Sequence, residues 1–448
     1  MPVTIRSLWG AYALGAAAFP VALGAFALPV LAETTLTIAT VNNGDMIRMQ
    51  KLTDDFTSKH PDIKLQWVTL EENVLRQRVT TDIATKGGQY DVVTIGNYEV
   101  PIWAKQNWLL ALDGMPADYD AADLLPAVRS ALSVGDKLYA VPFYGESAMV
   151  MYRKDLAQKA GVSIPESPTW AQILDAAKAM TDKSGEVYGI CLRGKAGWGE
   201  NMAFLTAMAN SYGAAWFGQD WKPQFDGPEW KAALGDYVGA MKDYGPPGAS
   251  TNGFNENLAL FQQGKCGMWI DATVAASFVT DPKESKVADQ VGYARFPHKD
   301  GVENTGNWLW SWNLAVPASS KKSDAAKAFV AWATSKGYTE LVAAKEGWRA
   351  APPGTRTSLY ENPEYQEAAP FAALTLQSID AVTPDHPSVK DTPYTGGQFV
   401  AIPEFQAIGT AVGQQFSAAV AGQAKVDQAL QSAQQLTTRE MTRAGYIK

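Results

Sequence analysis

The amino-acid sequence predicts an α/β fold in which parallel strands alternate with helices. Residues 35–41 alternate apolar and polar side chains and are rich in β-branched residues, which is typical of a strand. Residues 91–95 form a nearly continuous apolar run, as in a parallel strand covered on both faces. Between them, Leu75, Val79 and Ile83 recur at helical spacing. Strands connected by helices in this way imply right-handed βαβ units and a parallel sheet.

The connections of this first region have clear turn and stop signals. The turn at 42–44 (Asn-Asn-Gly) ends the first strand, and a helical pattern begins at Asp45. That pattern stops near Pro61, because the residue before a proline avoids the helical region. A second strand is predicted at 63–67, and the helix after it closes at Gly87-Gly88.

Helical patterns dominate the rest of the chain. The expected helices cover 170–180, 202–211, 229–241, 255–263, 324–334 and 426–441, and the expected strands cover 188–192, 266–270 and 308–316. There is no internal repeat and no low-complexity linker. If the chain forms two lobes, we therefore expect it to cross between them through short ordered segments.

Length and charge limit the classes of function. At about 100–200 residues per domain, 448 residues predict two or three domains. The formal net charge is −8 and no strong basic stripe interrupts it, so nucleic acid is not an expected partner. The chain has only three His and two Cys, the usual ligands of zinc, so we expect no metal site.

Residues 1–32 resemble a secretory signal peptide. They carry one charge, Arg6, followed by an apolar stretch that ends at Ala32. A retained membrane anchor is the alternative, which Pro20 and Pro29 disfavour. We expect cleavage near Ala32 and an exported, soluble mature chain.

Export places the two cysteines in an oxidising space. Cys191 and Cys266 can pair there, although nothing in their spacing requires it and free buried cysteines are common. The sequence leaves the pairing open and favours two free thiols.

Sequence motifs for common enzyme classes are absent. The chain has no GxxxxGK[ST] loop, no GxGxxG turn, no HExxH pair and no GxSxG elbow. We therefore expect no catalytic residues and no cofactor. A pair of carboxylates for glycoside hydrolysis stays open, because two such groups need to be close only in space.

The informative residues are aromatic side chains beside polar groups. Trp308, Trp310 and Trp312 alternate and would project from one face of a strand. Other aromatic residues stand next to polar ones in loops: Asn97-Tyr98, Trp198 near Asn201, Trp269 near Asp271, and Trp348-Arg349. Sugars and polyols need aromatic faces for their C–H groups and polar side chains for their hydroxyl groups. Core packing is the alternative interpretation of each tryptophan taken alone.

Four stretches of the mature chain resemble one protein family. They are TLTIATVNNGDMIRMQKLTDDF (35–56), YDVVTI (90–95), LYAVPFYGESAMVMYRKDL (138–156) and WNLAVPASSKKSDAAKAFVAWATS (312–335). The chain is similar over most of 33–448 to the extracytoplasmic solute-binding proteins of bacterial ABC transporters, in their carbohydrate-binding group. Within that maltose-binding-like group, the opening stretch is most similar to sorbitol- and mannitol-binding proteins.

The resemblance implies a two-lobed periplasmic-binding-protein fold with a ligand cleft between the lobes and a short ordered hinge. The N-terminal lobe would comprise 33–144 and 305–345. The C-terminal lobe would comprise 145–304 and 346–448. Carried over position by position, the resemblance implies these ligand-binding residues: Asn42, Asn43, Asn97, Tyr98, Glu146, Trp198, Asn201, Asp271, Trp310, Trp312, Trp348 and Arg349. The segment with Trp310 and Trp312 often reads Gly-Gly-Trp in the family, and the extra indole predicts a tighter or more apolar pocket.

The same resemblance implies capture without chemistry. We expect a periplasmic monomer that closes on a small neutral polyol or sugar and docks on membrane permease subunits. The alternative is a secreted glycoside hydrolase or lyase with Glu146 and Asp271 as acid and base. A third interpretation is that the ligand-bound protein docks on the ectodomain of a sensor, which the sequence alone does not separate from transport.

Overall fold

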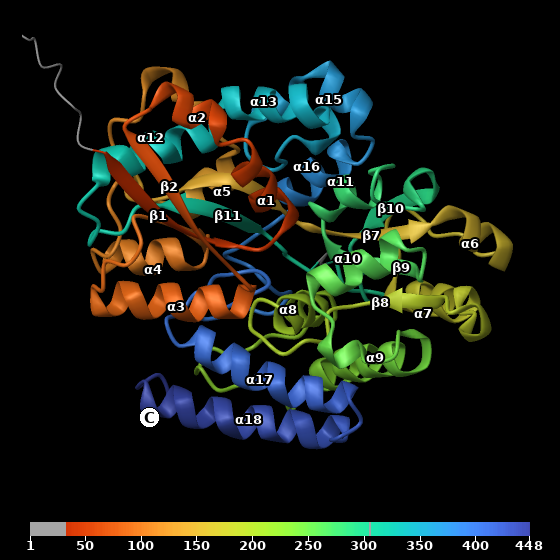
Figure 1. The fold of residues 1–448 in the computed structure, drawn as a ribbon. Helices are drawn as coiled ribbons and strands as arrows, with labels where there is room; N and C mark the ends of the chain where they lie inside the picture. Colours follow the sequence, from red (N-terminus) through yellow and green to blue (C-terminus); the bar gives the residue numbers. More distant parts are fainter. Residues whose placement is uncertain (1–32, 304–305) are drawn as a thin grey trace, which may run out of the picture.

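The computed structural model describes residues 33–303 and 306–448, and the expected signal peptide at 1–32 lies outside them. Two sheets organise the molecule (Figure 1). The first has the strand order β2-β1-β3-β11-β6 and the second the order β10-β7-β9-β8. The strands of the first sheet are β1 Thr34–Val41, β2 Ile63–Leu70, β3 Val92–Gly96, β6 Val141–Glu146 and β11 Trp310–Ala315. Those of the second are β7 Ala148–Arg153, β8 Tyr188–Cys191, β9 Cys266–Ala272 and β10 Val291–Arg295.

The first sheet is mixed. Strand β1 pairs in parallel with both β2 and β3, as the sequence predicts, whereas β11 runs antiparallel to β3 and β6. The α/β class is confirmed, and the parallel part is the segment in which strands and helices alternate. Strand β11 begins two residues later than predicted, so Trp308 precedes it.

Helices cover both sheets. Around the first sheet and its edges lie α1 Gly44–Lys51, α2 Asp54–Lys59, α3 Glu72–Thr85, α4 Glu99–Lys105, α5 Pro126–Ala131, α12 Ser323–Ala333 and α13 Lys336–Glu346. Around the second lie α6 Lys154–Ala160, α7 Trp170–Met180, α8 Asn201–Ser211, α9 Pro228–Tyr244, α10 Phe254–Gln262, α11 Ala275–Val279, α16 Ala372–Asp380, α17 Phe405–Val420 and α18 Val426–Arg443. Helices α14 Thr357–Glu361 and α15 Pro363–Ala368 pack on each other and on the next helix along the chain. A small hairpin pairs β4 Ser133–Val134 with β5 Lys137–Leu138.

Local signals set the helix ends well. Helix α7 starts where predicted, because Thr169 and Gln172 form a reciprocal capping box. The helical pattern predicted after Asp45 is interrupted: α1 ends at Lys51 and α2 begins at Asp54, with Leu52 as the C-terminal cap of α1. Helices α17 and α18 pack against each other and against α9, and α17 also contacts α8; both lie at the bottom of the view in Figure 1.

The chain crosses from the first sheet to the second at Ser147, the single residue between β6 and β7. Beside this crossing, the N–H of Gly145 donates to the carbonyl of Pro353 at 2.8 Å. A Cβ atom on Gly145 would lie 2.3 Å from the carbonyl oxygen of Gly354, whose own φ is +66°. Both positions require glycine, because the backbones of Gly145 and Gly354 are in contact and Gly354 also has a left-handed backbone conformation. The lobe boundaries at 144/145, 304/305 and 345/346 stay predictions.

A disulfide joins Cys191 at the end of β8 to Cys266 at the start of β9. The preference for free thiols was wrong: the fold brings the two Cα atoms to 5.9 Å, within the range that a disulfide spans. The spacing of 75 residues between them in the sequence does not indicate this contact. Among the described residues, no helix combines the length and hydropathy needed to cross a bilayer. The same residues contain no cluster of His, Cys, Asp or Glu suited to a metal ion.

Candidate functional site

A cavity of about 90 Å³ lies between the two sheets. Its wall is built from residues that follow strand ends: Asn42 and Asn43 after β1, Glu71 and Glu72 after β2, and Arg193 after β8. Ligands of open α/β sheets bind beyond the carboxyl ends of the strands. The remaining lining residues are Val41, Arg76, Tyr144, Glu146, Lys195, Trp198, Gly199, Glu200, Ala203, Phe254, Asn255, Glu256, Val274, Trp308, Trp310, Trp312 and Gln398.

Half of the predicted ligand-binding residues share this cavity. They are Asn42, Asn43, Glu146, Trp198, Trp310 and Trp312. Asn43 also caps helix α1, with its oxygen accepting from the N–H of Met46 at 3.0 Å. Its side-chain nitrogen donates to the hydroxyl of Tyr144 at 2.7 Å, which fixes the orientation of the amide.

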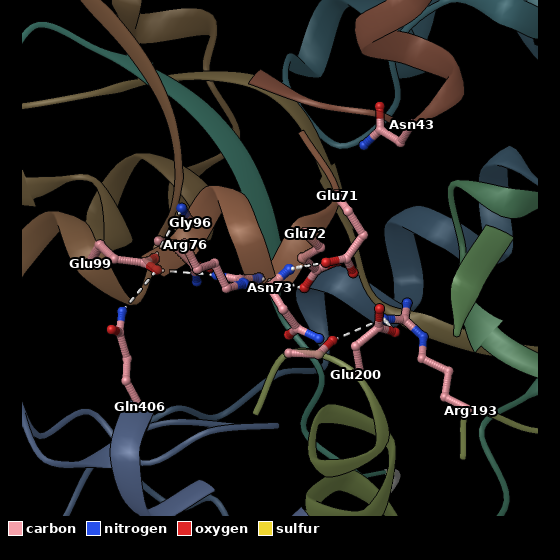
Figure 2. Close-up of polar contacts among 12 residues, drawn as sticks. Asn43, Glu71, Glu72, Asn73, Arg76, Gly96, Glu99, Arg193, Glu200 and Gln406 are labelled. Carbon is pink, nitrogen blue, oxygen red and sulfur yellow. Dashed lines mark hydrogen bonds and ion pairs between the residues drawn. The ribbon is translucent and has the colours of Figure 1, made fainter. Parts of the chain in front are cut away.

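The tryptophans enclose an arginine that the sequence did not reveal. The guanidinium of Arg76 lies 4.0 Å from the ring centre of Trp198 and 4.7 Å from those of Trp310 and Trp312. Glu72 accepts from Arg76 at 2.8 Å and Glu99 at 3.1 Å, so the cation is neutralised where it stands (Figure 2). The ring of Trp310 meets those of Trp198 and Trp312 edge to face, and these rings and the paired cation together form one wall of the cavity.

A second arginine stands on the opposite wall. Arg193 binds the carboxylate of Asp271 through Nε at 2.9 Å and Nη2 at 2.7 Å, and Nη1 donates to the carbonyl of Gly199 at 2.9 Å. Asp271 was predicted to contact ligand, but it is not among the lining residues of the cavity. Its side chain is fully buried behind Arg193 and also accepts from the indole N–H of Trp269 at 3.1 Å. Asp271 was expected just after a strand that ends at residue 270, whereas β9 extends to Ala272 and includes it.

Three further predicted residues support the wall without lining it. The side chain of Asn97 bonds the carbonyl of Leu309 at 3.2 Å and the N–H of Ser311 at 3.3 Å. The hydroxyl of Tyr98 donates to the carbonyl of Ile402 at 2.7 Å. Asn201 donates to the carbonyl of Gly413 at 2.8 Å. Their polar groups satisfy loop backbone, which is the structural role open to any buried amide or hydroxyl.

Trp348 and Arg349 lie apart from the cavity. Both belong to a short 3₁₀ turn, Trp348–Ala350, and neither is among the lining residues. Arg349 approaches Asp281 at 3.9 Å. The structure therefore does not bring these two residues together with the other predicted ligand-binding residues.

Charged residues that sequence reasoning missed complete the site. Glu71 caps helix α3 by accepting from the N–H groups of Asn73 and Val74. It also pairs with Lys195 of the other lobe at 2.5 Å. Glu71 directly follows β2 and Lys195 follows β8 closely, so the rule that found Asn42 would also have found them.

The two walls touch, so the cleft is closed. The side chain of Asn73 donates to the carbonyl of Ala196 at 3.4 Å. A Cβ on Gly197 would lie 2.6 Å from the oxygen of Asn73, and one on Gly199 would lie 2.4 Å from an oxygen of Glu72. Glycine on both sides of Trp198 therefore permits the loop to meet helix α3.

Burial controls the ionisation of the cavity carboxyls. It raises the pKa of Glu146 well above 4.5, against the opposing pull of Arg193. Burial and then the charge of Glu72 raise the pKa of Glu200 to about 8, although Arg193 and Lys195 oppose the shift. Around these groups the cavity offers indole faces and hydrogen-bonding groups of both kinds, which suits a small hydroxylated guest.

The fold and this cleft define a binding protein, and the chain belongs to the bacterial extracellular solute-binding proteins, whose family pattern matches residues 43–340. A "Mannitol-binding protein" of Pseudomonas aeruginosa is 58% identical over 429 residues, which cover 95% of this chain and 98% of that protein.

Solved structures give the same result. An ABC transporter solute-binding protein from Agrobacterium vitis S4, crystallised with D-mannitol, is 72% identical with a TM-score of 0.92, covering 93% of this chain and 100% of that one. Maltose-bound MalE3 of T. maritima has a TM-score of 0.77 at 21% identity, over 90% of this chain and 99% of that one, and shares the fold.

Membership of this family makes the chain a non-enzymatic transport component. The hydrolase alternative is overturned by the comparisons, and the structure gives a physical reason for one of its two residues. Asp271 is fully buried and saturated by Arg193, so it has no free oxygen with which to serve as an acid or a base.

Proposed function

We propose that this chain captures D-mannitol or a closely related small uncharged polyol in the periplasm. The lobes close around the ligand, and the closed form delivers it to the membrane permease subunits of an ABC transporter. The chain acts as a monomer that is exported through the signal peptide at 1–32, with cleavage near Ala32. A neighbour with bound D-mannitol at 72% identity supports the ligand class.

The observation that carries the proposal is the composition of the cavity wall. Trp198, Trp310 and Trp312 supply ring faces for the C–H side of an extended polyol. Asn43, Glu146 and other polar lining groups supply partners for its hydroxyl groups. Both lobes contribute, so the closed form gains ligand contacts that an open form lacks, and this difference shifts the hinge equilibrium.

The charge of the wall fits an uncharged ligand. Each cation that lines the cavity among the described residues already has a carboxylate partner: Arg76 has Glu72 and Glu99, Arg193 has Asp271, and Lys195 has Glu71. A phosphate or carboxylate on the ligand would be buried without a free counter-ion, which is costly.

Isothermal titration calorimetry and thermal melting with a ligand panel test this function. D-mannitol and sorbitol should raise the melting temperature, with about 2.7 kcal/mol of stabilisation at a concentration of 100 Kd. Hexoses and maltose should shift it less. A melting shift with maltose but none with any alditol would contradict the proposal.

A tryptophan variant tests the site itself. Trp310→Ala should lose affinity and most of the ligand-induced change in fluorescence, because Trp310 lines the cavity. Trp170→Phe is the matched control, since Trp170 is buried in the core of the other lobe and bonds Ser211 at 2.8 Å. If Trp310→Ala lowers only the melting temperature, Trp310 is a packing residue.

A further inference from the structure

Glu200 has an unusual position for a carboxyl group. It lies at the N-terminal cap of α8, lines the cavity and is 4% exposed. Its Oε2 atom is buried and accepts no hydrogen bond from any described residue. A buried carboxylate oxygen without a donor is costly, and protonation of the carboxyl group removes that cost.

The cations near Glu200 are committed to other carboxylates. Lys195 lies 3.4 Å from Oε1 of Glu200 but 2.5 Å from Glu71. Arg193 lies 3.7 Å from Oε2 of Glu200 but 2.7 Å from Asp271, which it binds through two nitrogens. Neither cation is therefore dedicated to Glu200.

Like charges surround Glu200 when the cleft is closed. Glu71 and Glu72 approach from the start of helix α3, above Glu200 in Figure 2. Glu146 of β6 and Glu256 of α10 line the same cavity. Arg76 lines the cavity as well, but Glu72 and Glu99 neutralise it. Burial among carboxylates favours the uncharged form of an acid.

We propose that Glu200 carries a proton in the closed cleft and donates it in a hydrogen bond to a hydroxyl group of the bound polyol, so that ionisation of Glu200 releases the ligand. This inference rests on the proposed function. A carboxylic acid offers one donor and one acceptor, which matches a hydroxyl, whereas the carboxylate only accepts. The pKa of about 8 agrees with the geometry and places the release at mildly alkaline pH.

Calorimetry with D-mannitol at pH 6, 7, 8 and 9 tests the inference. For the unmodified chain, affinity should fall above pH 7 and approach about a tenfold loss per pH unit at the alkaline end, as expected when binding requires one proton. Glu200→Gln should bind with nearly constant affinity over the same range, because a carboxamide also donates and accepts without titrating.

Two further variants sharpen the result. Asp113→Asn changes the net charge by the same amount as Glu200→Gln, at an exposed site paired with Lys137. Its affinity for D-mannitol should fall with rising pH in the same way as that of the unmodified chain. Glu146→Gln reports on the other buried carboxyl of the cavity. A pH-independent affinity of the unmodified chain would overturn the inference. The inference would also be overturned if the affinity of Glu200→Gln still fell with rising pH. The same holds if Glu146→Gln, and not Glu200→Gln, removed the fall in affinity.

The failure of the proposed function has a different signature, namely no binding of any polyol by the unmodified chain at any pH. That result would overturn the inference together with the proposed function. If Glu200→Gln does not fold, ¹³C NMR of the glutamate carboxyls of the unmodified chain with saturating D-mannitol provides the test. A Glu200 midpoint near 8 supports the inference, and one near 4.5 overturns it.

Discussion

The ammonium group of Lys195 lies 2.5 Å from the carboxylate of Glu71, and this ion pair joins the two lobes across the mouth of the cavity. Lys195 follows a strand of the second sheet and Glu71 follows a strand of the first. The pairing lowers the pKa of Glu71 and raises that of Lys195, although burial opposes both shifts. Because the two residues follow strands of different sheets, we expect this pair to separate when the cleft opens.

Glu71→Gln should therefore weaken ligand binding without unfolding the chain. Both partners are partly exposed, so we expect a loss of about 0.2–1 kcal/mol, equivalent to a severalfold rise in Kd. Calorimetry at low and high salt measures this loss, which should shrink as salt screens the pair. An equal loss at both salt concentrations would mean that Glu71 acts through its cap of helix α3 instead.

Gly199→Ala should hold the cleft open. Its Cβ would lie 2.4 Å from an oxygen of Glu72, a contact that forms only on closure. We expect at least a tenfold loss of affinity with a nearly unchanged melting temperature of the ligand-free chain. Small-angle scattering with saturating ligand should show incomplete compaction. Gly235→Ala is the control, because a Cβ there meets open space.

Asp271→Asn should cost both stability and affinity. Arg193 is buried and would lose its counter-ion, and breaking a buried pair typically costs about 3–5 kcal/mol. Urea unfolding measures the stability. Replacing both partners by apolar residues (Arg193→Met with Asp271→Leu) should recover part of the stability but not the binding. If Asp271→Asn has an unchanged free energy of unfolding, the ion pair does not stabilise the fold.

Reduction of the disulfide should destabilise the second lobe. The bond between Cys191 and Cys266 closes a loop with a sequence separation of 75, and such cross-links contribute about 2–4 kcal/mol. Urea unfolding with and without a reducing agent measures the difference. A double Cys→Ser variant should match the reduced chain and be insensitive to the reductant. Identical unfolding of the oxidised and reduced chains would contradict the expectation.

Stability should fall as pH rises from about 5 to 8. Glu200 has a pKa of about 8 when folded and 4.5 as its ordinary value, so the folded chain retains a proton that the unfolded chain releases. Its contribution is complete below pH 4.5 and is lost as pH rises to 8. Carboxyls with lowered pKa values, such as Glu71, act below this window. Thermal melting should show a shallower decline for Glu200→Gln than for the unmodified chain.

Much of the site could be predicted because parallel strands deliver their loops to one edge. Asn42 and Asn43 follow β1, and they line the cavity as the sequence suggested. The same rule applied to β2 and β8 would have added Glu71 and Arg193. Asp271 shows the limit of the rule, because a strand buried on both faces gives no pattern that separates a wall residue from the group behind it.

The sequence by itself determined the α/β class, the helices and strands with strong periodicity, and the indole-rich segment at 308–312, because these depend on neighbours along the chain. Only the tertiary structure decided that Arg76 fills the space between three indole rings, that Cys191 meets Cys266, and that carboxyls from two lobes share one cavity. Those features depend on which distant segments come together, and contact across space leaves no local periodicity in the sequence.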